Sequence, residues 1–92
     1  MNWARRFMSP RAEFIFVVDA DYVVQRHALE RALAYCTADD IALVQFPQDY
    51  RNVNRANRGV ALDYRHYFTG YMNMANRLGC VPSTGTLTLL RV

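Results

Sequence analysis

The sequence predicts an α/β fold, because two apolar strand-like segments flank an amphipathic helix. Residues 13–19 contain five large apolar side chains in succession, a pattern typical of a strand that is buried on both faces. Residues 41–46, which read IALVQF, predict a second buried strand. A strand, a helix and a strand with short links form a βαβ unit, so we expect the two strands to be parallel neighbours with a right-handed crossover. Within residues 25–36, the spacing predicts a helix whose buried face carries Leu29, Ala32, Leu33 and Cys36.

The rest of the chain predicts another strand and a longer helix. Aromatic and apolar residues between Val60 and Leu78 keep helical spacing over about five turns. The β-branched and leucine content of residues 86–92 predicts a third strand, so about three strands and two main helices are expected in all. Residues 2–8 resemble the end of a helix, and the chain ends at a strand. We therefore expect residues 1–92 to be the central part of a larger domain, without an internal boundary.

The composition excludes several classes of protein. Apolar residues make up 52% and charged residues 21% of the chain, which indicates a globular protein. All 11 basic residues are arginines that do not cluster, so we expect no nucleic-acid partner. No apolar run approaches the roughly 20 residues that span a bilayer, so we expect this segment itself to be soluble. Cys36 and Cys80 lack the spacing of a metal site or a disulfide framework and are expected to be free thiols.

Two carboxylates follow the first predicted strand. Asp19 and Asp21 stand at its carboxyl end, where parallel sheets bind ligands, with the small Ala20 between them. Alternation along an extended segment points both side chains the same way. Two convergent carboxylates suit a hard divalent cation such as Mg²⁺, which can also bridge to phosphates. The alternative is a pair of solvated acids that cap the following helix.

The residues around this pair extend the pattern over nearly the whole chain. The pattern runs through EFIFVVDADYVV (13–24), ALVQFPQDYRN (42–52) and STGTLTLLRV (83–92). In order and spacing it resembles the processive glycosyltransferases of family two, the cellulose-synthase-like group, with Val92 in place of a second arginine. The resemblance implies part of a GT-A core, which is Rossmann-like. The matching residues are Asn2, Trp3, Ala4, Ala12 to Ile15, Asp19 to Asp21, Gln45, Pro47, Gln48, Tyr50, Asn52, Gly85, Thr86 and Arg91.

The resemblance implies an inverting transfer of a hexose from a UDP-sugar to a growing polysaccharide or glycan acceptor. Asp19, Ala20 and Asp21 would form the D-x-D site that holds the diphosphate, with the two aspartates as ligands of Mg²⁺ or Mn²⁺. On the acceptor side, the implied residues are Gln48, Thr84, Gly85 and Thr86.

Several parts of the family pattern are missing from this sequence. The strand that holds the uracil base does not appear, and the T-E-D and Q-x-x-R-W motifs are expected beyond residue 92. No catalytic residue is therefore assigned, and we expect no transferase activity from this chain alone. The resemblance implies a parent protein embedded in a membrane, with this domain on the cytoplasmic face. Without its partners, the aromatic face of residues 64–74 is expected to promote self-association.

Other interpretations of the residues compete with this one. A strand that ends in D-x-D also resembles the first motif of haloacid-dehalogenase-type phosphatases, but the chain has no lysine and no acid after Asp63. A non-catalytic interaction fragment would carry the same residues as a piece of a transferase. Asp63 and His66 favour a solvated pair on the long helix over a catalytic one. Ser83 has no triad-like partners.

Overall fold

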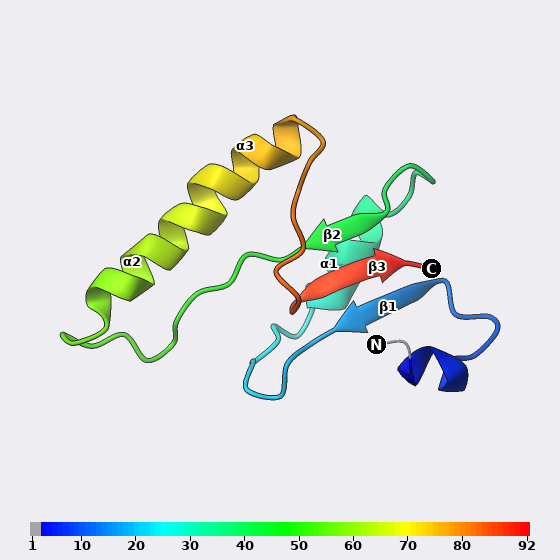
Figure 1. Ribbon diagram of the computed structural model, residues 1–92, viewed down its shortest axis with the longest axis horizontal. Coiled ribbons are helices and arrows are strands. Elements are labelled where there is room, and N and C mark those ends of the chain that lie inside the picture. The colour runs from blue at the N-terminus through cyan, green and yellow to red at the C-terminus, as the bar shows by residue number, and fades with distance from the viewer. Residues whose placement is uncertain (1–2) are drawn as a thin grey trace.

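The computed structural model describes residues 3–92, with residues 4 and 5 as backbone only, so Asn2 of the matched pattern lies outside it. The predicted α/β class is confirmed, with three strands and two main helical segments (Figure 1). In chain order the elements are η1 (Ala4–Phe7, a 3₁₀ helix), β1 (Phe14–Val17), α1 (Ala28–Tyr35), β2 (Leu43–Gln45), α2 (Arg58–His66), η2 (Tyr67–Tyr71, a π-helical segment), α3 (Met72–Arg77) and β3 (Thr88–Arg91).

The sheet has the strand order β1-β3-β2, and β3 runs antiparallel to both of its neighbours. The prediction that the first two strands are neighbours is therefore wrong, because β3 lies between them. Their predicted parallel direction is right, since both run antiparallel to β3. Leu89 pairs with Phe16 on one side and with Val44 on the other. Thr88 and Leu89 are each only 1% exposed. The central position gives β3 backbone partners along both edges and the deepest burial in the sheet.

The first helix buries small side chains. Ala28 and Ala32 are buried, whereas Leu29 and Leu33 remain 44% and 39% exposed. The predicted buried face was thus right for Ala32 and wrong for the two leucines, because the spacing of three and four fits more than one face of a short helix.

The side chain of Arg91 fastens the end of α1 to the sheet. Its guanidinium donates hydrogen bonds to the backbone carbonyls of Cys36 (2.8 Å), Ala38 (3.0 Å) and Ile41 (3.2 Å). It also lies 4.9 Å from the centre of the Phe14 ring on β1. One side chain of the central strand therefore holds the α1–β2 connection and contacts β1.

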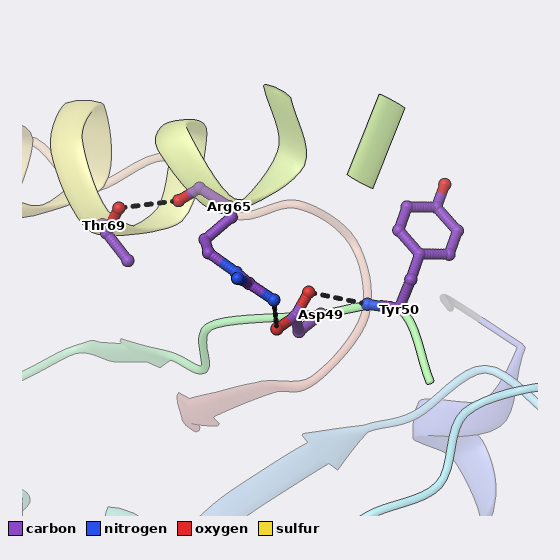
Figure 2. A network of polar contacts seen from close by, with 4 residues as sticks. All are labelled: Asp49, Tyr50, Arg65 and Thr69. Carbon is purple, nitrogen blue, oxygen red and sulfur yellow. Dashed lines mark hydrogen bonds and ion pairs between the residues drawn. The ribbon is translucent and has the colours of Figure 1, made fainter. Parts of the chain in front are cut away.

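The predicted long helix is confirmed as one rod formed by α2, η2 and α3, which stands beside the sheet at the end of two long connections (Figure 1). The ion pair of Arg65 with Asp49, at 2.8 Å, joins this rod to the connection that follows β2 (Figure 2). In the same view the Thr69 hydroxyl donates to the Arg65 carbonyl at 2.8 Å. The buried side chains of the rod are Ala61, Phe68, Met72 and Ala75.

Several apolar side chains of this rod and of its C-terminal end remain exposed, among them Val60, Tyr71, Met74 and Leu78. The expected self-association through the aromatic face of residues 64–74 stays a prediction. No helix within residues 3–92 has both the length and the hydropathy that crossing a bilayer requires.

Candidate functional site

The two predicted metal ligands lie in a turn just beyond β1. The backbone N–H of Tyr22 donates to the Asp19 carbonyl at 3.1 Å, and Ala20 and Asp21 form the tip of this turn. The extended alternation expected for this segment is therefore wrong. The turn still places the two aspartates next to each other in space, because only one residue separates them.

The carboxylates of Asp19 and Asp21 are accessible to a ligand at the surface. Both residues are exposed, and neither forms an ion pair with any side chain that the structure describes, namely those of residue 3 and residues 6–92. Those residues contain no group of three or more histidine, cysteine or acidic side chains suited to a metal. A pair of carboxylates with phosphate and water as the other ligands is how Mg²⁺ is commonly held, so this donor set fits a Mg²⁺–diphosphate unit.

The turn is joined directly to the loop that carries the predicted acceptor residues. The backbone N–H of Asp19 donates to the Thr86 hydroxyl at 2.9 Å, and Thr86 is buried. The structure therefore brings the predicted metal residues and the predicted acceptor residues together at one end of the sheet.

The backbone of this loop, Thr84–Thr86, adopts a conformation that glycine favours. Gly85 has a φ of 86°, in the left-handed region that side chains disfavour. Leu87, which precedes β3, also has a positive φ of 47°. A left-handed conformation costs a non-glycine residue about 1–2 kcal/mol, and burial of the Leu87 side chain offsets this cost.

Gln45 of β2 holds the loop in this shape. Its side-chain oxygen accepts hydrogen bonds from the Thr84 N–H at 2.9 Å and from the Thr88 hydroxyl at 2.7 Å. Its side-chain nitrogen donates to the carbonyls of Thr86 at 3.0 Å and Leu87 at 3.2 Å. One amide therefore binds the loop at both of its ends.

Gln48 lies at the centre of the site. Its side chain is 5% exposed, and its oxygen accepts from the hydroxyls of Tyr22 at 2.7 Å and Tyr64 at 3.3 Å. Its nitrogen donates to the Thr84 hydroxyl at 2.8 Å and to the Thr86 carbonyl at 3.4 Å. All four predicted acceptor-side residues are thus adjacent, although Gln48 itself is enclosed by protein.

The hydroxyl of Tyr22 is held in its neutral form. Burial raises its pKa to about 12, and the Tyr64 hydroxyl and then the carboxylates of Asp21 and Asp19 act in the same direction. The phenol therefore remains a hydrogen-bond donor to Gln48 throughout the physiological range.

A groove of about 400 Å³ lies beside the loop. Aromatic rings form much of its wall, with the Tyr64 ring centre 5.5 Å from that of Phe68 and the Tyr67 ring centre 5.1 Å from it. Asp63 contributes a carboxylate to the lining. The full lining is Val60, Asp63, Tyr64, Tyr67, Phe68 and Thr84.

Sequence reasoning missed three residues of this site. Gln45 stands in the matched pattern, yet no role was assigned to it. Tyr22 directly follows the acidic pair, and that position was its only signal. Tyr64 was interpreted as a packing residue of the long helix, because helical spacing does not distinguish a ring that packs from one whose hydroxyl also bonds a distant side chain.

The mixed α/β core, with its three strands and flanking helices, is consistent with part of a GT-A-type transferase core. A family model described as glycosyltransferase like family 2 matches residues 2–92, so the chain belongs to this family. Comparison with curated proteins found no match. Comparison with solved structures found none either. Membership makes this a glycosyltransferase domain, and the family binds nucleotide-sugar donors and acceptors in general.

Proposed function

We propose that this chain carries the donor-diphosphate site and part of the acceptor site of a processive, cellulose-synthase-like glycosyltransferase that uses a UDP-hexose. The observation that carries this proposal is the hydrogen bond between Asp19 and Thr86, which joins an exposed pair of carboxylates to the loop of the acceptor side. Two sites that must hold the two reacting molecules side by side are here part of one hydrogen-bonded unit.

On the donor side, Asp19 and Asp21 would hold Mg²⁺ or Mn²⁺. The bound dication would neutralise negative charge on the departing nucleoside diphosphate. The side chains themselves bind and orient the donor, and the small Ala20 leaves room for the diphosphate. The Thr86 hydroxyl fixes the backbone of Asp19, which keeps the turn in one conformation before any ligand arrives.

On the acceptor side, the groove beside Thr84 suits a sugar ring. A sugar has apolar C–H faces that can pack on the rings of Tyr64 and Tyr67, and hydroxyls that can bond to Asp63 and Thr84. No residue of this chain is assigned as the general base, so we expect binding without transfer. Embedding of the parent protein in a membrane, with this domain on its cytoplasmic face, belongs to the proposal and rests on the family resemblance.

Titration of the full chain with Mn²⁺, with and without UDP, tests the proposal. We expect saturable Mn²⁺ binding that UDP strengthens, and loss of both effects in Asp21→Asn, which keeps the size of the side chain. Asp40→Asn is the matched control, because Asp40 is an exposed acid outside the turn. Wild-type protein that binds neither Mn²⁺ nor UDP would overturn the donor-site assignment and favour a non-catalytic interaction fragment.

A further inference from the structure

A single buried amide links the two halves of the site. The side-chain oxygen of Gln48 accepts a hydrogen bond from the hydroxyl of Tyr22, which is the last residue of the metal turn. Its side-chain nitrogen donates one to the hydroxyl of Thr84, which is the first residue of the acceptor loop. These partners are 26 residues before and 36 residues after it in the chain. These two hydrogen bonds of Gln48 form a continuous path from the metal turn to the acceptor loop.

The chemistry of this position favours a primary amide. Its oxygen has two acceptor sites, which the hydroxyls of Tyr22 and Tyr64 use, and its nitrogen has two donors, which Thr84 and Thr86 use. A carboxylate would keep the acceptors and lose the donors, and an aliphatic side chain would lose both. Because the group is buried and its partners lie on both sides, its orientation is fixed.

The turn is attached to the loop at both of its ends. Asp19 is bonded to the Thr86 hydroxyl, and Tyr22 is bonded through Gln48 to Thr84. The 3.1 Å hydrogen bond between Asp19 and Tyr22 closes the turn between these two attachments. Asp21 lies between the two attached residues of this turn, so a displacement of the loop would be passed to the backbone that carries its carboxylate.

We propose that Gln48 is a positioning residue that couples the metal turn Asp19–Tyr22 to the acceptor loop Thr84–Thr86. Occupation of the donor site then fixes the loop against which the acceptor binds, and an occupied acceptor side strengthens donor binding in return. This inference rests on the proposed function of the two segments, and it adds the residue that makes them act together.

Two variants break the link through Gln48 at different hydrogen bonds. Gln48→Glu keeps the acceptor for Tyr22 and removes the donors to Thr84 and Thr86, whereas Tyr22→Phe removes only the hydroxyl that joins the turn to Gln48. Gln25→Glu, at an exposed position, is the matched control for the added charge. Tyr22→Phe also keeps the test informative if a buried glutamate prevents folding.

The first measurement is amide hydrogen exchange without ligand. We expect Gln48→Glu to speed exchange at Asp19 and Thr84 by roughly tenfold relative to Phe46, as expected when a buried hydrogen bond is lost. The Phe46 N–H, bonded to the Leu87 carbonyl at 2.9 Å, reports unfolding that is not confined to the link. Unchanged exchange at Asp19 and Thr84 in both variants would overturn the role of Gln48.

The second measurement adds Mn²⁺ and UDP. In wild-type protein we expect UDP to bind and the amide exchange of Thr84 to become slower when it does. The exchange is measured with Mg²⁺, because Mn²⁺ is paramagnetic. In Gln48→Glu and Tyr22→Phe we expect affinity to fall several-fold and the response at Thr84 to disappear. If wild-type protein binds UDP but the exchange at Thr84 does not change, the coupling is overturned and the proposed function is not. Absence of any wild-type binding overturns the proposed function, and the coupling then has no catalytic meaning.

Discussion

The hydroxyl of Thr86 accepts a 2.9 Å hydrogen bond from the backbone N–H of Asp19, a residue 67 positions earlier in the chain. This bond fixes the start of the turn that carries both candidate metal ligands. It is made by a side chain to a backbone group, so the identity of residue 86 determines it directly.

Replacement of Thr86 by valine keeps the shape of the side chain and removes the acceptor. We expect a loss of about 1–3 kcal/mol in the free energy of unfolding, because the Asp19 N–H loses its partner. Urea denaturation measures this loss, and Thr86→Ser is expected to recover much of it. The control is Thr37→Val at an exposed position, and an equal effect of the two valine variants would contradict the assigned role.

The raised pKa of Tyr22 predicts a dependence of stability on alkaline pH. The pKa is 10.0 in the unfolded chain and about 12 in the folded protein, so between these values the unfolded state loses a proton that the folded state retains. The stabilisation is therefore complete below pH 10 and is lost as the pH rises toward 12. We expect urea midpoints of wild type and Tyr22→Phe to converge in this range. Tyr35→Phe, at an exposed tyrosine, should leave the profile unchanged.

Two glycines with open surroundings predict opposite effects of the same substitution. A β-carbon at Gly85 or Gly59 would meet no atom within 4 Å, so the backbone conformation decides the outcome. Gly85→Ala is expected to cost about 1–2 kcal/mol, because φ is 86° there. Gly59→Ala, within α2, is expected to stabilise by up to about 1 kcal/mol. Thermal denaturation gives both signs, and destabilisation by both variants would contradict this reasoning.

The fork of donors on Arg91 predicts that lysine cannot replace it. Its guanidinium reaches three carbonyl oxygens between Cys36 and Ile41, which a single ammonium group cannot match. We expect Arg91→Lys to lower the free energy of unfolding by about 1–3 kcal/mol, measured in urea. Arg77→Lys at the exposed end of α3 serves as the control, with an expected change below about 0.5 kcal/mol.

The sequence located the elements better than it arranged them. Apolar runs and helical spacing predicted the strands and the long helix, because burial leaves a local pattern. The place of β3 between the other strands was not predictable in this way, since the pattern at Leu89 records burial and not the identity of the neighbours. A βαβ unit was expected instead, and its two strands are separated in the sheet.

In the candidate site, too, the sequence predicted individual residues but not their contacts. Asp19, Asp21 and the loop from Thr84 were found through their residue types and a family pattern. The hydrogen bonds of Gln48 were not found, because they depend on partners far away in the chain. The turn at Ala20 is local, but the apolar run before it favoured an extended segment instead. A buried glutamine looks the same in a sequence as an exposed one.

The outer edge of β1 has a consequence for where a neighbour can act. Within residues 3–92, β1 pairs only with β3, so its other row of N–H and C=O groups has no strand beside it. A further strand that aligns with this row would have one terminus next to the Asp19–Tyr22 turn. Side chains at that terminus would approach the acidic pair from the side opposite Thr86. Asp19 and Asp21 would then lie between the added strand and the Thr84–Thr86 loop.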